Sequence, residues 1–415
     1  MQRARVLVPR KAMRLIGYWR AERRTLRHGL VALLLSTVAS FVAGVILGAM
    51  TGTLQRLPGL FILIPASVGM RGVISGTTGA RLGTSIAAGL FDVSFRRGGV
   101  LRDNAVIAVV LTLVSSVYVA ILARAAASVF GEPTIPFVDL VTISVVGGAI
   151  GTAIVLTATV ALAVTSFRRG WDLDTVATPM ITAVGDMVTL PALLAAAVLV
   201  EIDSARIAIA TACLGATVAA LFVAMRSERR IRRVLVEMVA VLVIVPVLDV
   251  LAGTLLEAQS ARLLAYPALL ILIPPFISQA GALGGILSSR LSSKLAVGVI
   301  TPRGRPERPA LIDAAIVVAY ALTIFAFIGA LGFGLGALLG KDAPGIWAMV
   351  GGTLVAGLIV LPILVGLGYY LAVGTTRFGL DPDNLSIPLI TGVMDLAGIA
   401  AVLLAMSLSR VNLHG

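Results

Sequence analysis

The sequence predicts an all-α, polytopic membrane protein made of two repeats, and three observations indicate it. The chain has 415 residues, of which 59% are hydrophobic and only 13% charged, and its mean hydropathy is +1.04. A soluble globular protein carries about 25% charged residues. Apolar stretches near or above the ~20 residues needed to cross a bilayer occur along most of the chain. In addition, two segments of the sequence recur at one constant spacing.

About eleven transmembrane helices are expected, as two parallel five-helix repeats joined by one linking helix. The first repeat is predicted to span the membrane at 29–52, 59–91, 103–129, 137–166 and 175–200. The linking span is predicted at 205–225, and the second repeat at 234–256, 266–299, 310–338, 345–372 and 384–409. The expected division is therefore a basic cytoplasmic tail (1–28), a first repeat (29–200), a linking helix with a basic loop (201–233) and a second repeat (234–415).

The second span of each repeat carries the clearest duplication. The segment at 60–89 and the segment at 269–298 are identical at 11 of 30 positions without a gap, and Pro65 and Pro274 are 209 positions apart. A spacing of half the chain indicates duplication of a large unit, because solenoid repeats have periods of about 20–50 residues. Apolar segments interrupted by Pro and Gly at corresponding positions are typical of the substrate path in transporters.

Basic residues predict the orientation of the chain. With the N-terminus inside, the inner segments carry 23 Lys and Arg residues, nine of them in the tail, and the outer segments carry five: Arg56, Arg206, Arg262, Lys341 and Arg410. The positive-inside rule then predicts a cytoplasmic N-terminus and an outer C-terminus in an inner or plasma membrane. The formal charge of +13 is thus assigned to orientation and to contact with lipid headgroups, and no nucleic-acid partner is expected.

The fifth span of each repeat places a carboxylate near mid-membrane. Asp186 and Asp395 are 209 positions apart, and each lies about eleven residues into its predicted span. A carboxylate at that depth costs several kcal/mol unless it is paired, hydrated or bound to a cation. Carboxylate, hydroxyl and carbonyl oxygens are the ligands of hard divalent cations such as Mg²⁺, which usually keeps several waters. The two aspartates are therefore predicted to hold a divalent cation between the repeats.

Further residues are expected to support this path. Thr182 and Thr391 lie four positions before the aspartates on the same helical face, and Pro179 and Pro388 free backbone carbonyls below them. The second spans contribute Gly72, Gly281, Ser75 and Gln279, although small residues there also serve close helix packing. Asp249, matched by Ser40 in the first repeat, is an accessory candidate. A polar cluster at the inner mouth either gathers cations or caps the fifth helices: Asp172, Asp174, Asp381, Asp383 and Asn384.

Other interpretations of the same residues remain open. The aspartates could be structural and paired with arginine, and Arg71 is the candidate partner because it also lies near mid-depth, although its counterpart is Ala280. An anion or organic-solute carrier would instead use Arg71, Arg81 and Arg290 as ligands. An intramembrane lipid enzyme is the least expected class, because the chain has only two His and one Cys from which to build a catalytic site.

The second and fifth spans resemble the MgtE-type domain of divalent-cation transporters, most closely its two-domain solute carrier 41 branch. The resemblance rests on P-x6-G-x8-R-L, with GMRG at 69–72, and on D-x-V-A-T-P…G-D-x-x-T-L at 174–190, and it covers about residues 29–409. It implies a dimer-like helical pore, Asp186 and Asp395 as the ion-holding residues, and Mg²⁺, Mn²⁺ or Co²⁺ as transported ion. No resident cofactor and no enzyme activity are expected.

The resemblance also has departures. Val73 stands where the family has asparagine, and Ser75 stands at its downstream glutamate position. Ala282 and Gly284 occupy these places in the second repeat, where Gln279 is a nearby polar substitute. Because two repeats in one chain mimic a dimer, the sequence also favours a monomer.

Overall fold

The computed structural model describes residues 23–96, 98–169, 173–200, 206–379 and 382–408. Side chains at 23–28, 87, 169, 173–180, 182–183 and 382–384 are outside this description. The described part of the chain is helical throughout, with turns and short connections but no strand, which confirms the all-α prediction.

Each repeat contains five long helices. Those of the first repeat are α2 (Arg23–Ala49), α4 (Leu60–Ala87), α5 (Val100–Phe130), α6 (Phe137–Arg169) and α7 (Leu173–Val200). The linking helix is α8 (Arg206–Arg226). Those of the second repeat are α9 (Arg229–Ala258), α11 (Pro267–Ala296), α12 (Arg308–Leu338), α13 (Ile346–Phe378) and α14 (Pro382–Leu408).

The number of spans agrees with the prediction. Ten of these helices, all except α7, contain a described stretch long and apolar enough to cross a membrane. Helix α7 is 28 residues long, and its segment Val184–Val200 is apolar as well. The predicted ends were less accurate, since α9 begins at Arg229 inside the predicted basic loop. Hydropathy marks the apolar part of a helix, whereas backbone hydrogen bonding continues through polar residues at its ends.

The duplication seen in the sequence is also present in the helices that flank the second spans. Two short helices, α3 (Thr51–Arg56) and α10 (Ser260–Ala265), precede α4 and α11 and are 209 positions apart. Gly89 and Gly298, which follow α4 and α11, have φ values of 68° and 77°. This left-handed conformation is the usual way to end a helix, and glycine adopts it without steric cost. The repeats therefore begin and end their central helices alike.

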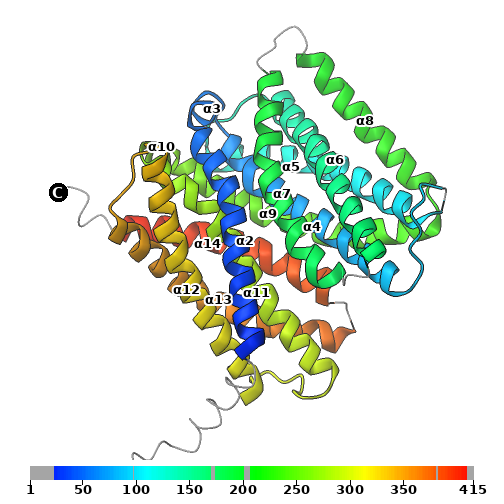
Figure 1. Cartoon of the computed structure of the whole chain (residues 1–415). Helices are drawn as coiled ribbons and strands as arrows, with labels where there is room; N and C mark the ends of the chain where they lie inside the picture. The colour runs from blue at the N-terminus through cyan, green and yellow to red at the C-terminus, as the bar shows by residue number, and fades with distance from the viewer. Residues whose placement is uncertain (1–22, 97, 170–172, 201–205, 380–381, 409–415) are drawn as a thin grey trace, which may run out of the picture.

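The first helix of each repeat packs against the other repeat. Helix α2 lies along α11, and α9 lies along α4; Figure 1 shows α2 running across the front of the bundle beside α11. The contacts are close, because a Cβ at Gly253 would lie 2.6 Å from the Ile62 carbonyl oxygen, and one at Gly44 would overlap the Ile271 carbonyl oxygen. The two five-helix repeats are thus interleaved through their first helices.

Burial separates the centre of the bundle from its lipid-facing surface. Of the ten measured spans, α4 and α11 have the largest buried shares, 83% and 78%, and α8 the smallest, 22%. Apolar side chains such as Ile207 and Val218 point outward from α8, which lies at the edge of the bundle (Figure 1). An outward apolar surface of this extent suits lipid. The second helices of both repeats therefore form the core of the molecule, and the linking helix lies against its side.

Candidate functional site

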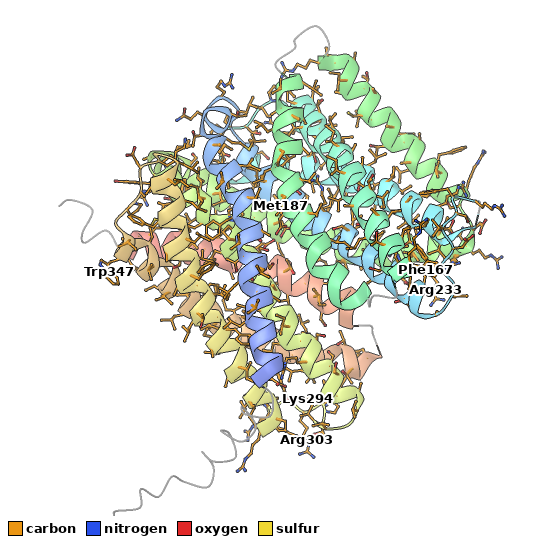
Figure 2. All side chains as sticks on the ribbon, in the orientation of Figure 1. Phe167, Met187, Arg233, Lys294, Arg303 and Trp347 are labelled. Carbon is orange, nitrogen blue, oxygen red and sulfur yellow. The ribbon has the colours of Figure 1, made fainter. Side chains whose placement is uncertain are left out.

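The Asp186 carboxylate lies where three helices from both repeats meet. Its Oδ2 accepts hydrogen bonds from Ser40 on α2 at 3.3 Å and from Ser278 on α11 at 3.1 Å. The two hydroxyl oxygens are themselves 3.3 Å apart. Met187, the neighbour of Asp186, lies between the two ends of the bundle, whereas Lys294 and Arg303 lie together at one end (Figure 2). Asp186 is partly buried.

Asp395 has a different environment from Asp186. Its side chain is buried on α14, near the carboxyl group of Asp249 on α9. The Asp186 carboxylate also acts electrostatically on Asp395. Asp249 is fully buried against the backbone of Gly69 on α4, where a Cβ would overlap its carboxylate. Carboxyl groups from both repeats therefore interact in the middle of the molecule.

These two environments are symmetry counterparts with different chemistry. Position 40 corresponds to 249, position 186 to 395, and position 69 to 278, each at the spacing of 209 residues. In the first repeat's half, Asp186 faces two serine hydroxyls. In the second repeat's half, Asp395 faces a second carboxyl group, Asp249, across from a glycine. The site is thus built by a two-fold arrangement but is not symmetric in charge.

The described side chains offer oxygen ligands without forming a closed metal cage. No group of three or more His, Cys, Asp or Glu among them is arranged to hold a metal ion directly. Carboxylate and hydroxyl oxygens suit hard divalent cations, and Mg²⁺ in proteins usually keeps several waters while one or two carboxylates bind it. The donor set therefore fits a partly hydrated divalent cation better than a structural metal held by protein ligands alone.

The predicted supporting residues occupy several different places. Gly281 on α11 packs on Thr391 of α14, since a Cβ there would lie 3.2 Å from the threonine methyl group. The Thr391 hydroxyl donates to the Ile387 carbonyl in its own helix at 3.0 Å. Pro388 is buried within α14. Gly72 lies in α4, the counterpart helix of α11. The following predicted residues or their side chains are outside the described part: Pro179, Thr182, Asp172, Asp174, Asp381, Asp383 and Asn384.

Gln279 and Ser75 do not contact the aspartates in the described structure. The buried Gln279 amide donates to the Ser36 hydroxyl of α2 at 3.3 Å. The Ser75 hydroxyl donates to the Arg71 carbonyl at 2.7 Å, although Ser75 lies 3.9 Å from where a Cβ on Gly185 would be. Neither residue is hydrogen-bonded to an aspartate among the described atoms, and their role in the cation path stays a prediction.

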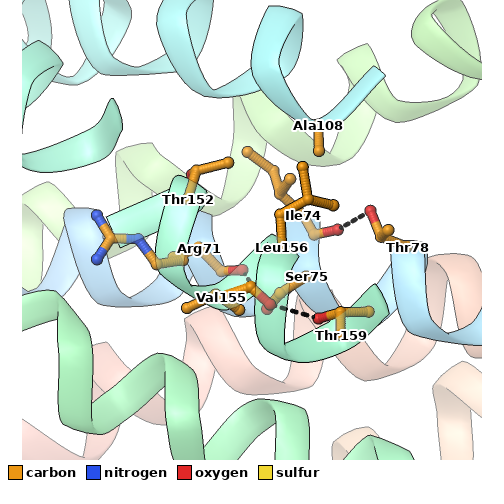
Figure 3. Close-up of a pocket in the computed structure, with 9 residues that line it drawn as sticks. All are labelled: Arg71, Ile74, Ser75, Thr78, Ala108, Thr152, Val155, Leu156 and Thr159. Atoms are coloured by element: carbon orange, nitrogen blue, oxygen red, sulfur yellow. Dashed lines mark hydrogen bonds between the residues drawn. The ribbon is translucent and has the colours of Figure 1, made fainter. Parts of the chain in front are cut away.

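Arg71 lies beside a small cavity within the first repeat and is not hydrogen-bonded to Asp186 among the described atoms. It is buried, and its Nη2 donates to the Gly147 carbonyl on α6 at 3.2 Å. No described atom accepts from its Nε or Nη1. The cavity it lines measures about 10 Å³ and is shared by α4, α5 and α6 (Figure 3), which is roughly the space of one water. The interpretation of Arg71 as the ion-pair partner of Asp186 is therefore wrong.

Arg81 and Arg290 are held by side chains of the third helices. The Arg81 Nε donates to the Asn104 side-chain oxygen at 2.8 Å. The Arg290 guanidinium pairs with the buried Asp313 carboxylate at 2.9 Å, and Lys294 pairs with the same carboxylate at 2.6 Å. Asn104 and Asp313 are again 209 positions apart. These contacts give both arginines a structural role in joining the second and third helices of each repeat.

Sequence reasoning missed part of this site. Ser278 was not predicted, and Ser40 entered only as the counterpart of Asp249. The signal that could have found them is the alignment of the repeats itself. At the constant spacing, Ser40 matches Asp249, and Ser278 matches a glycine, Gly69, where helices approach closely. A serine matched by a carboxylate, as Ser40 is by Asp249, marks an interior polar position, and a serine matched by a glycine at a close helix contact marks a position that faces the other repeat.

The fold and site define the class of this protein. Two interleaved helical repeats enclose carboxylate and hydroxyl oxygens within a bundle of apolar helices, and transporters commonly place their substrate site at such a repeat interface. A model of the MgtE family, described as a divalent cation transporter, matches residues 64–196 and 273–405. The chain belongs to the MgtE family of divalent cation transporters, with one family domain in each repeat. No solved structure matches the chain.

Proposed function

We propose that this protein transports divalent metal cations, with Mg²⁺ as the main substrate, along a path at the pseudo-two-fold interface of the repeats. The observation that carries this proposal is the meeting of Asp186 with hydroxyl groups of α2 and α11 in the interior, near the buried Asp395 carboxylate of the other repeat. Membership of the MgtE family supports divalent cations as the substrate class. The aspartates hold the ion near the middle of the membrane.

The chemistry of the site explains how an ion could be held and released. Interacting carboxylates repel one another when both are charged, and a divalent cation between them removes that repulsion. The Ser40 and Ser278 hydroxyls can bond either to the Asp186 carboxylate, as they do here, or to water on the ion. A partly hydrated ion needs few protein ligands, so it loses little hydration on entering and can leave.

The anion-carrier alternative has less support. It requires Arg81 and Arg290 as ligands, but both guanidinium groups contact side chains of the neighbouring helix. Arg71 borders space for about one water.

We retain several finer predictions as part of the proposal: the division at 28, 200 and 233, the solute carrier 41 branch, a monomer in contact with lipid, and an inner or plasma membrane location with the N-terminus in the cytoplasm.

Flux measurements test this proposal. Purified protein would be reconstituted into liposomes that contain a fluorescent metal indicator. Mg²⁺, Mn²⁺ or Co²⁺ would then be added outside, one ion at a time. We expect wild-type uptake and loss of at least about 90% of it in Asp186→Asn/Asp395→Asn, because two carboxylate ligands are removed while the side-chain shape is kept. Anion uptake by the same vesicles would be followed in parallel.

A matched control uses another carboxyl-to-amide change. Glu237 lies exposed on α9 and pairs with Arg233 at the surface, so Glu237→Gln should transport like the wild type. Normal cation flux in the folded double variant would contradict the aspartate site but leave a transporter possible. Wild-type vesicles that move none of the three cations would contradict the proposed substrate class.

A further inference from the structure

Some buried aspartates in this molecule pair with basic groups, and others, Asp103 and Asp249 among them, have no described hydrogen-bond donor. Asp139 pairs with Arg206, and Asp313 pairs with Arg290 and Lys294. Asp249 is as fully buried as Asp313, yet no described basic group lies within ion-pair distance of it. No described N–H or hydroxyl group donates to either of its carboxylate oxygens. An isolated buried carboxylate is costly, and proteins normally pair it or bind it to a cation.

The surroundings of Asp249 direct it toward the candidate ion site. It lies near Asp395 of α14, the helix that packs along α9. There is space for the Asp249 carboxylate because position 69 of the opposite repeat is glycine. A Cβ at that position would overlap the carboxylate. Three helices, α4, α9 and α14, thus converge to bring a third carboxyl group to the interface. Helix packing alone would be better served by an apolar residue at this position.

The counterpart in the first repeat sharpens the inference. Ser40 holds the equivalent position on α2, and its hydroxyl donates to Asp186. A neutral donor beside Asp186 stabilises that carboxylate without any ion, whereas a second carboxylate beside Asp395 repels it. The half of the site that belongs to the second repeat therefore gains more from an incoming cation. This difference in charge predicts that the ion is held unequally by the two repeats.

We propose that Asp249 is a third carboxylate at the site of the transported cation, acting on the ion through its bound water, without an equivalent in the first repeat. It extends the proposed function, since it assumes that Asp186 and Asp395 face a divalent cation. Asp249 and Asp395 form the stronger half of the site, and Asp186 with its two serines forms the weaker half. The asymmetry arises because one chain carries both repeats, so that positions 40 and 249 can differ.

Metal binding by the full-length protein in detergent tests this role. Mn²⁺ would be the probe, titrated by electron paramagnetic resonance, and thermal unfolding would be recorded with and without Mg²⁺. Asp249→Asn should weaken Mn²⁺ binding about tenfold or more, because affinity follows the number of charged ligands. The same variant should be at least as stable as the wild type without metal, because a like-charge contact is lost. Glu237→Gln, on the same helix, should change neither quantity.

The possible outcomes separate this proposal from the proposed function. Wild-type Mn²⁺ affinity in Asp249→Asn, together with loss of binding in Asp186→Asn/Asp395→Asn, would overturn the role of Asp249 alone. Wild-type affinity in both would overturn the cation site as well. Asp249→Ser, which copies the first repeat, provides a second variant. If both Asp249 variants fail to fold without metal, the carboxylate is structural and the proposal is wrong.

Discussion

At the scale of single residues, the two repeats hold a matched arginine of the second helix with side chains of different charge. Arg81 is held by Asn104 in the first repeat, and Arg290 by Asp313 in the second. The extra negative charge of Asp313 is matched by Lys294, whose counterpart in the first repeat is Ser85. The second repeat therefore has one additional negative and one additional positive side chain at these matched positions. This pattern is the opposite of Asp249, whose charge has no such compensation.

Replacing Asp313 and Lys294 by their first-repeat counterparts should show that the two charges compensate each other. Asp313→Asn leaves the partly buried Arg290 and Lys294 without their carboxylate and should destabilise the protein by about 2–3 kcal/mol. Adding Lys294→Ser recreates the arrangement of the first repeat and should recover most of the loss. Thermal unfolding in detergent would measure both variants. A double variant no more stable than Asp313→Asn would show that the two positions are not coupled.

At the scale of elements, close helix approach depends on glycines at matched positions. Gly44 lies on the Ile271 carbonyl where α2 crosses α11, and Gly253 lies on the Ile62 carbonyl where α9 crosses α4. Small residues of this kind let transmembrane helices come together. Because Ser40 lies one turn before Gly44, the same crossing also sets the position of the hydroxyl that bonds to Asp186.

Adding one methyl group at this crossing should be costly. Gly44→Ala would push α2 away from α11, and we expect a loss of about 1–3 kcal/mol of stability together with reduced cation uptake. Gly334→Ala in α12 is the matched control, because no described atom lies within 4 Å of a Cβ there. Thermal unfolding and liposome flux would compare the two variants. Equal behaviour of both would argue against the tight contact.

At the scale of the whole molecule, the repeats cannot separate as two independent bundles. Helix α2 packs against the second repeat and α9 against the first, so each repeat completes the other. The family matches fall on the two repeats separately, at 64–196 and 273–405, and both exclude the first helices α2 and α9. The helices that join the repeats are thus the ones outside the matched segments.

A crosslink across the repeats would test this interleaving. The Ser40 and Ser278 hydroxyl oxygens are 3.3 Å apart, so cysteines introduced at both positions, in a Cys213→Ser background, should form a disulfide on oxidation. A site-specific protease, with its recognition sequence inserted at residues 227–228 between α8 and α9, would then cut the chain there. On a denaturing gel without reductant we expect the two halves to remain joined, and to separate with reductant. Two separate halves after oxidation would contradict the packing of α2 on α11.

Much of the architecture could be predicted from the sequence, because it depends on local properties. A long apolar segment must become a helix in a bilayer to satisfy its backbone hydrogen bonds, so the spans and the all-α class were predicted and confirmed. The repeat at 209 residues is visible in residue identity alone. The same spacing indicated Asp186 and Asp395, whose role as ion ligands stays a prediction.

The tertiary structure alone decided which spans meet. Hydropathy describes each helix by itself, and it cannot state that α2 crosses to the opposite repeat or that Ser278 lies 3.1 Å from Asp186, 92 positions away in the chain. Depth in the membrane also left Arg71 open as a candidate partner for Asp186, whereas packing turns this guanidinium toward Gly147. Contacts between distant helices follow from side-chain shape at their crossings, which is a property of two surfaces and not of one sequence segment.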